Sequence, residues 1–364
     1  MKLKYGCNPD QESTLSFDTK QPFEILHGEP GYINILDAIY SYSLVMEVKN
    51  NLQQICAASY KHTSPAGVSI GYSSYDAYNK ARNCDPKSSF GDFIAINHEV
   101  DEKLALYIKT CVSDGIIAPS YTKDALEILK KKKQNKFLIF QGFDDIILEY
   151  AEEVRCFGNV KLTQTISLTK IDNHLLKNIV SNKKILFEDS RLDLLLSVIT
   201  LKYTQSNSTC FTYKGQVIGI GAGQQSRIDC VRMARQKAEI WFLRQKTNLK
   251  FLENIKRQER INATISYLQD DFSPIEYKRW CKLFTEVPKP LTPNEKHIIL
   301  DQFHGIVLGS DGFFPFRDSI DQASKINVEY VIQPGGSRAD DSVIEAINEY
   351  NMLMVFTNLR LFLH

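Results

Sequence analysis

The sequence lacks paired cysteines. Its eight cysteines show no CxxC spacing and are scattered at positions 7, 56, 84, 111, 156, 210, 230 and 281. A disulfide framework and a structural zinc site are therefore both disfavoured. Cys56 and Cys111 lie inside apolar runs, where a free thiol behaves as a small hydrophobic side chain. This usage predicts a reduced, cytoplasmic setting.

An excess of one charge is also missing, since 44 basic and 43 acidic residues leave a net charge of +1. That balance does not favour a nucleic-acid or membrane surface. No run approaches the length of a membrane span, and the opening MKLKYGCNPDQES has no apolar core of a signal peptide. The 364 residues, 43% of them hydrophobic, suffice for two globular domains.

The stretch QQICAASYKHTSPAGVSIG, residues 53 to 71, organises the rest of the chain. The apolar run from Ile55 to Tyr60 predicts a buried strand, and Pro65 and Gly67 predict that the chain breaks after Lys61 and His62. Open α/β sheets bind ligands at strand ends. There, Lys61 can supply a fixed positive charge and His62 a base that titrates near neutral pH. An ordinary pair of solvent-facing side chains explains the same spacing.

Glycine-rich turns recur at other predicted strand ends. Gly91 precedes the apolar run of SSFGDFIAIN, where it either lets the backbone approach a ligand or forms a plain bulge. Asp114-Gly115 predicts a turn before a buried strand at Ile116–Ala118. The stretch GQVIGIGAGQQSR reads as strand, glycine loop and helix start. Because Gln224 replaces the third glycine of the dinucleotide fingerprint, a Rossmann site is not indicated. The loop can still hold an anion or a carboxamide, with Arg227 in the first helical turn.

The last third repeats a plan of strand, polar or aromatic loop, and helix. It holds SDGFFPFRD at 310 to 318, QPGGSRADD at 333 to 341, and the closing strand before TNLRLFLH. Three such junctions in succession predict one shared cleft.

Helical periodicity is clearest at 34–49, 73–84 and 189–202. Residues 246–300 are polar, charged and mostly helical, which predicts a peripheral arm. The run Lys130–Lys133 ends a predicted helix and is interpreted as a solvated helix end, with a phosphate-binding role as the less favoured alternative.

Nine ordered motifs then match a known family. KYGCNPDQ, KHTSPAGVSIG, DPKSSFGDFIA, VSDGIIAP, KYTQSNS, GIGAGQQSR, SDGFFPFRD, PGGSRADD and TNLRLFLH resemble the transformylase half of the bifunctional purine biosynthesis enzyme. That half transfers a formyl group from 10-formyltetrahydrofolate to AICAR (5-aminoimidazole-4-carboxamide ribonucleotide). None of the nine motifs belongs to the cyclohydrolase domain of that enzyme. We therefore expect a stand-alone transformylase, with a separate protein acting as IMP cyclohydrolase.

The resemblance implies an α/β fold of duplicated cytidine-deaminase-like αβα domains without zinc. We place the first at residues 1–175, with the Lys-His pair, and the second at 176–364, with the arm at about 246–300. His27-Gly28-Glu29 mimics half of the zinc-deaminase signature, but no PCxxC completes it.

By the same resemblance, His62 is the catalytic base and Lys61 stabilises the transition state. The implied AICAR contacts are Lys4, Tyr5, Gly91, Asp114, Asn207, Arg227, Asp318, Arg360 and His364. The implied folate contacts are Ile228, Gly312, Phe313, Pro315, Ser337 and Arg338. No catalytic metal is implied; whether a structural monovalent cation binds stays open.

Four positions depart from the family pattern. Lys4 replaces an arginine, so a bidentate phosphate contact becomes a point charge. Asp10 replaces a histidine, Gly312 an alanine and Ser319 an asparagine. The family is a homodimer whose sites use both chains, and we expect the same here. Two alternatives remain: a protein that binds AICAR without turnover, and a variant that uses formate and ATP.

Overall fold

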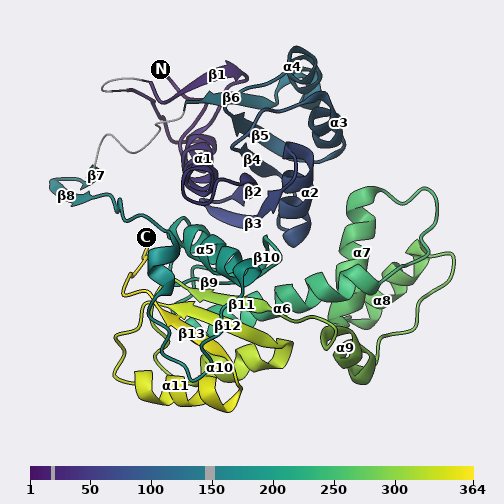
Figure 1. Ribbon diagram of the computed structural model, residues 1–364. Coiled ribbons are helices and arrows are strands. Elements are labelled where there is room, and N and C mark those ends of the chain that lie inside the picture. The colour runs from purple at the N-terminus through teal and green to yellow at the C-terminus, as the bar shows by residue number, and fades with distance from the viewer. Residues whose placement is uncertain (18–20, 144–151) are drawn as a thin grey trace.

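One mixed sheet of 11 strands runs through the molecule, in the order β1-β6-β5-β4-β2-β3-β10-β9-β11-β12-β13 (Figure 1). The computed structural model describes residues 1–17, 21–143 and 152–364. The predicted α/β class is confirmed. No helix in these residues is both long and apolar enough to cross a bilayer.

The first half of the sheet and its helices come from the residues up to Gly142. The strands are β1 (Phe23–His27), β2 (Ile55–Lys61), β3 (Ser64–Gly71), β4 (Asp92–Ile96), β5 (Ser113–Ala118) and β6 (Leu138–Gly142). The helices are α1 (Tyr32–Leu52), α2 (Ser74–Cys84), α3 (Glu102–Thr110) and α4 (Lys123–Lys130). Ser73, Asp101 and Thr122 cap α2, α3 and α4 by accepting backbone N–H bonds.

The second half comes from the residues from Glu188 onward. The strands are β9 (Thr209–Tyr213), β10 (Gln216–Gly221), β11 (Ile306–Ser310), β12 (Val328–Gln333) and β13 (Leu353–Phe356). The helices on this sheet are α5 (Glu188–Lys202), α6 (Arg227–Lys246), α10 (Asp318–Ala323) and α11 (Asp340–Glu349). The helices predicted at 34–49, 73–84 and 189–202 are confirmed as α1, α2 and α5.

The two halves repeat one order of elements. Helix α1, hairpin β2–β3, helix α2 and the parallel strands β4, β5 and β6 correspond to α5, β9–β10, α6 and β11, β12 and β13. The halves meet where β3 pairs antiparallel with β10. The two halves are therefore related by an approximate two-fold rotation about an axis that passes through the sheet between β3 and β10. On this repeat we propose the division between residues 175 and 176; the cytidine-deaminase likeness stays a prediction.

Helices cover both faces of the sheet. On one face, α1 and α5 share a continuous apolar core that includes Leu44, Val45, Leu195 and Ile199. On the other face, α2, α3 and α4 cover the first half, while α6, α10 and α11 cover the second. The sheet is thus the middle of three layers, and the loops lie at the two ends of its strands.

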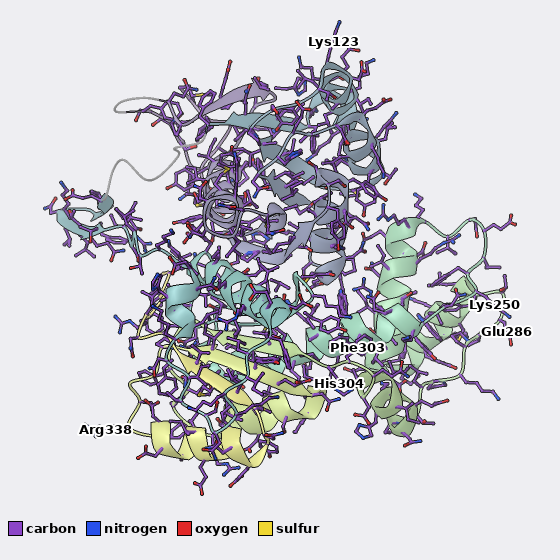
Figure 2. All side chains as sticks on the ribbon, viewed as in Figure 1. Lys123, Lys250, Glu286, Phe303, His304 and Arg338 are labelled. Carbon is purple, nitrogen blue, oxygen red and sulfur yellow. The ribbon has the colours of Figure 1, made fainter. Side chains whose placement is uncertain are left out.

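The segment predicted as an arm, at about 246–300, contains three helices. Helices α7 (Arg257–Gln269), α8 (Pro274–Trp280) and α9 (Pro293–Leu300) lie beyond the end of α6 and form their own small core around Tyr267 and Trp280. The arm extends away from the sheet, and Lys250 and Glu286 mark its outer side (Figure 2).

A separate ribbon is formed by β7 (Glu152–Phe157) and β8 (Val160–Thr165), which pair with each other and with no other strand of the described residues. It projects on the side where the carboxyl terminus lies (Figure 1).

Candidate active site

The predicted catalytic pair lies at one end of the strands of the sheet. This end of the strands is called an edge of the sheet below. Lys61 ends β2, which runs antiparallel to β4, and β4 runs parallel to β5. The end of β2 therefore lies beside the start of β4, after Gly91, and the start of β5, at Asp114. In the second half, the antiparallel pairing of β9 with β10 and β11 brings the start of β9 and the ends of β10 and β11 to this same edge. Predicted residues from both halves thus share an edge.

The turn after Lys61 differs from the prediction. Pro65 and Gly67 do not break the chain but lie inside β3, opposite Tyr60 and Ser59. A Cβ at Gly67 would lie 2.1 Å from the Ala81 carbonyl oxygen, so this glycine lets α2 pack directly on the strand. The prediction was wrong because it took a packing glycine for a turn glycine.

The turn itself is His62-Thr63. Lys61 pairs with Ser64, which leaves a two-residue hairpin loop whose φ angles are 54° at His62 and 57° at Thr63. Such loops favour asparagine and glycine, because other residues pay for a left-handed backbone. A histidine and a β-branched threonine are therefore unfavourable choices here, and strained positions of this kind concentrate at functional sites. The His62 side chain is exposed.

A buried acid from α1 holds this turn. The Oδ1 atom of Asp37 accepts a hydrogen bond of 2.7 Å from the Thr63 N–H, and Asp37 is only 5% exposed. Burial, opposed in part by this bond, raises the pKa of Asp37 to about 6. The sequence reading did not single out Asp37.

Lys61 is fixed by the turn that precedes β4. Its Nζ donates to the Phe90 carbonyl oxygen at 2.8 Å. Gly91 follows with φ of 79°, a conformation that favours glycine. Its N–H donates to the Val112 carbonyl oxygen at 2.9 Å.

A buried ion pair lies directly behind that turn. Arg82 Nη1 and Asp92 Oδ1 are 2.6 Å apart, with side chains 5% and 0% exposed. The other carboxylate oxygen of Asp92 accepts from the hydroxyls of Ser59, at 2.6 Å, and Tyr78, at 3.0 Å. Arg82 also donates to the Val112 carbonyl oxygen, which ties the network to Gly91. The backbone that holds Lys61 is therefore supported by fully paired buried groups.

Asp114 pairs with Lys133, a member of the lysine run interpreted above as a solvated helix end. Its Oδ1 lies 2.6 Å from the Nζ of Lys133, and both side chains are about half exposed, at 43% and 50%. The Nζ of Lys132 donates to the Cys111 carbonyl oxygen. The lysine run is therefore not only a solvated helix end, because α4 stops at Lys130 and the chain turns back toward the sheet edge.

The second cluster is centred on Arg227, at the start of α6. This buried guanidinium pairs with the buried carboxylate of Asp311 and donates to Asn207 Oδ1 at 2.7 Å. The Nδ2 of Asn207 donates to the carbonyl oxygens of Gln224 and Gln225 at 2.9 and 3.1 Å. The glycine loop, the polar stretch before β9 and the end of β11 are thereby joined.

The carboxyl terminus closes over this cluster. The Leu361 N–H donates to the Asp311 carbonyl oxygen at 2.9 Å, and the Leu363 N–H to Ser206 Oγ at 3.1 Å. The Phe362 ring lies 4.8 Å from the guanidinium carbon of Arg360 and 5.9 Å from that of Arg227. Its centroid is 5.8 Å from that of the His364 ring. Asn207, Arg227, Arg360 and His364 are therefore brought together.

Gly312 has a steric role in this closure. A Cβ on it would lie 2.6 Å from Arg227 Nη2 and 2.8 Å from the Phe362 ring. The glycine therefore lets the terminal segment approach Arg227 more closely than an alanine would allow.

The remaining predicted residues of the second half lie on helix starts and loops. Ile228 follows Arg227 in α6, and Asp318 starts α10. In the aromatic turn Phe313 is 42% exposed, Phe314 is buried and Pro315 is half-buried. Ser337 and Arg338 lie on the loop before α11, and Arg338 occupies an outer corner of the molecule (Figure 2).

Lys4 and Tyr5 pack elsewhere, at the start of α1. The Lys4 N–H donates to the Pro30 carbonyl oxygen at 3.0 Å, and the Tyr32 N–H to the Tyr5 carbonyl oxygen at 3.1 Å. In the described part of the chain, no hydrogen bond joins their side chains to Lys61 or to Arg227.

The Lys-His hairpin and the Arg227 cluster are linked by Gln205. Its backbone N–H donates to Ser64 Oγ at 3.3 Å, and its Nε2 donates to Thr63 Oγ1 at 3.4 Å. Within the described ranges, no direct hydrogen bond or ion pair connects the side chains of Lys61 or His62 with Arg227.

His27 is satisfied by the fold, since its Nδ1 lies 2.8 Å from the Phe137 carbonyl oxygen. Among residues 1–17, 21–143 and 152–364, no three His, Cys, Asp or Glu side chains are grouped so that they could hold a metal ion.

Comparison with known proteins identifies the family. Residues 1–237 match the family model described as the AICARFT/IMPCHase bienzyme. A protein of Elusimicrobium minutum (strain Pei191), named bifunctional purine biosynthesis protein PurH, is 32% identical over 364 residues, which are 100% of this chain and 58% of the relative. The proteins of that name from Persephonella marina and Leptospira biflexa are 32% and 30% identical, over 100% of this chain and 59% and 58% of their own lengths. The chain thus spans just under three fifths of the length of these relatives. It belongs to the AICARFT/IMPCHase bienzyme family.

Proposed function

We propose that this chain transfers the formyl group of 10-formyltetrahydrofolate to the 5-amino group of AICAR, giving formyl-AICAR. The observation that carries the proposal is the strained hairpin turn bearing Lys61 and His62, at the same edge of the sheet as the Asn207–Arg227 cluster. Family membership supports a role in purine biosynthesis.

His62 is the proposed base. The amino group of AICAR is conjugated with its ring and carboxamide, so it attacks well only if its proton is removed as the new bond forms. The amine nitrogen bonds to the formyl carbon, the imidazole accepts the amine proton, and the bond from the formyl carbon to folate N10 then breaks. The proton leaves with the folate nitrogen, so atoms and charge balance. The exposed position of His62 on a fixed turn suits this exchange.

Lys61 is the proposed electrostatic group. Attack on the formyl carbon places negative charge on its oxygen, and an ammonium held nearby stabilises that charge. The contact between Lys61 Nζ and the Phe90 carbonyl oxygen uses one of its three N–H donors, so two remain for a substrate. The buried Arg82–Asp92 network supports this arrangement by fixing the turn.

The remaining assignments divide between the two substrates. For AICAR we propose contacts with Asp114, Asn207, Arg227, Asp318, Arg360, His364, Gly91, Lys4 and Tyr5. For folate we propose contacts with Ile228, Phe313, Pro315, Ser337, Arg338 and Gly312, around the aromatic turn. The exposed ring of Phe313 supports a flat partner such as a pterin.

Synthesis of formyl-AICAR tests the proposal. Purified protein is given AICAR with either 10-formyltetrahydrofolate or formate plus ATP, and the product is followed by chromatography. Product with the folate donor alone is expected. Product only with formate and ATP favours the variant enzyme, and AICAR binding without product favours a binding protein; either outcome overturns the proposal.

We also propose that the active form is a homodimer. The β7–β8 ribbon supports this, because Phe157, Val160 and Leu162 are 64%, 56% and 58% exposed and cross-strand pairing puts them on one face. Apolar residues on a projecting ribbon are typical of an interaction surface. Arg155 of the ribbon donates to the carboxyl-terminal His364, which ties this surface to the candidate site. All eight cysteines are unpaired, which supports the proposed cytoplasmic location.

A further inference from the structure

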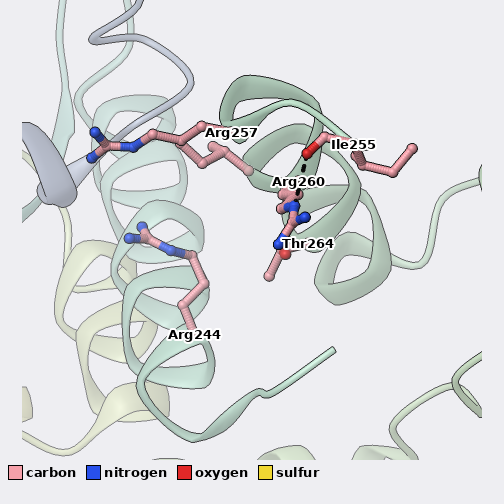
Figure 3. A pocket seen from close by; sticks show the side chains of 6 residues that line it. Arg244, Ile255, Arg257, Arg260 and Thr264 are labelled. Atoms are coloured by element: carbon pink, nitrogen blue, oxygen red, sulfur yellow. Dashed lines mark hydrogen bonds between the residues drawn. The ribbon is translucent and has the colours of Figure 1, made fainter. Parts of the chain in front are cut away.

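A cavity lined by arginines lies between α6 and α7. Its volume is about 420 Å³, and its lining consists of Arg244, Ile255, Arg257, Arg260, Ile261 and Thr264 (Figure 3). Arg244 lies near the end of α6, and the other residues come from α7 and the segment before it. Of the residues that the structure describes, no acidic one lines this cavity.

The three arginines have no carboxylate partner among the described residues. Seven other arginines do form such pairs: Arg82, Arg155, Arg191, Arg227, Arg232, Arg235 and Arg317. A shortage of acids does not explain the difference, because Glu253 and Glu259 are close in sequence and remain exposed. Three guanidinium groups around one hollow therefore lack a carboxylate within ion-pair distance among the described residues.

Arg244 is the clearest case of a guanidinium that is withdrawn from water without a paired carboxylate. It is partly buried, and its one described hydrogen bond runs from Nη2 to the Asn83 carbonyl oxygen at 3.0 Å. Burial lowers the pKa of its guanidinium below the ordinary value; the nearby Asp85 carboxylate opposes this shift but forms its ion pair with Lys237. Removing a cation from water without a paired anion is unfavourable, so an anion entering the cavity would gain from this charge.

The other two arginines are held in place before any ligand arrives. Arg257 donates to Thr110 Oγ1 at 3.0 Å and to the Tyr107 hydroxyl at 2.9 Å. Arg260 donates to the carbonyl oxygens of Leu252, Glu253 and Ile255 at 3.2, 3.1 and 2.9 Å. Fixing these side chains lowers the entropic cost of binding. Each guanidinium has five N–H donors, so donors remain for a ligand.

We propose that this cavity binds a small molecule that carries one or more phosphate groups. Planar guanidinium groups match phosphate oxygens bidentately, and three of them suit a ligand with more than one negative charge. Ile255 and Ile261 offer an apolar wall for the rest of the molecule. The inference stands independently of the proposed formyl transfer.

Calorimetry with inorganic pyrophosphate on the full chain, at fixed ionic strength, tests this site. The wild-type protein should bind saturably. Arg244→Gln and Arg257→Gln should each weaken binding at least about tenfold, since a hydrogen bond to a charged group contributes enough for that factor. Arg279→Gln is the matched control, because it removes the same charge from an exposed position on the arm outside the cavity. It should bind as the wild type does.

Circular dichroism and sedimentation separate loss of a site from loss of structure. Each variant should keep the wild-type spectrum and oligomeric state; Arg257→Gln, at the exposed end of the cavity, serves if Arg244→Gln does not fold. Triglutamate, as a polycarboxylate without phosphate, should bind more weakly than pyrophosphate. No saturable binding by the wild type, equal binding by Arg257→Gln and Arg279→Gln, or tighter binding of triglutamate would each overturn the proposal.

Discussion

Asp37 and Asp193 occupy matching positions in the two halves of the fold, in the second turns of α1 and α5. Each buried carboxylate accepts from the backbone of the hairpin turn that follows: Asp37 from Thr63 at 2.7 Å, and Asp193 from Lys214 and Gly215 at 2.8 and 2.7 Å. Burial raises both pKa values, to about 6 and about 7. The repeat therefore preserves a structural acid behind each turn, although only the first turn carries the Lys-His pair.

Asp37 should make the protein less stable as the pH rises. Between its ordinary pKa of 3.8 and its folded value of about 6, the folded state keeps a proton that the unfolded state has lost. Its contribution to stability is thus fully present below pH 3.8 and is lost as the pH rises through 6, at a cost of about 3 kcal/mol. Asp37→Asn should therefore raise the midpoint of urea unfolding at pH 7.5 more than at pH 4.5. Asp189→Asn, an exposed control, should not; equal shifts in the two variants would contradict the assignment.

Loss of the Arg82–Asp92 pair should destabilise the fold strongly. Asp92→Asn leaves a buried guanidinium without its counter-charge, which costs about 3–5 kcal/mol. Glu12→Gln breaks the exposed Lys2–Glu12 pair, whose side chains are 70% and 85% exposed, and should cost less than about 1 kcal/mol. Urea unfolding of both variants measures the difference. Similar losses would mean that the buried network does not support the turn behind Lys61.

His62→Ala should lower turnover by roughly 10² to 10⁴ if the imidazole is the base. His62→Asn should be as inactive but at least as stable as the wild type, because asparagine tolerates the left-handed backbone of the turn. Steady-state rates and thermal melting of both variants provide the test. Near-normal turnover in a folded variant would remove His62 from the reaction.

Lys61→Ala should cost on the order of 3 kcal/mol in transition-state stabilisation, read from kcat/KM. The proposed role is electrostatic, so Lys61→Arg should recover part of the loss and Lys61→Gln should not. Equal rates for the arginine and glutamine variants would place oxyanion stabilisation elsewhere.

Changing the ribbon surface should shift the proposed dimer toward monomer. Phe157→Asp combined with Leu162→Asp places charges on the apolar face, whereas Lys161→Asp, on the opposite face, serves as the control. Sedimentation velocity over a range of concentrations measures the shift. A wild-type protein that stays monomeric at all concentrations would contradict the dimer itself.

The sequence predicted the strand that carries Lys61, the helices with clear periodicity and the helical character of residues 246–300, because these depend on local patterns. It could not predict that β2 runs antiparallel to both neighbours, since register is set by distant strands. Gly67 misled the prediction because a glycine required for helix packing has the same local appearance as one in a turn. Asp37 gave a usable signal, as an acid within an otherwise apolar stretch of a helix. The arginine cavity gave none, because its charges converge only after α6 and α7 have packed.

Because the two repeats are related by a two-fold rotation, a molecule bound at the strand ends beside Lys61 meets different parts of each repeat. Equivalent hairpins point to opposite margins of the sheet, so the margin with Lys61 is built from amino ends of parallel strands in one repeat and carboxyl ends in the other. The repeated arrangement therefore gives this margin two unlike halves. Two unlike halves suit two chemically different ligands, as the proposed transfer from a folate to AICAR requires.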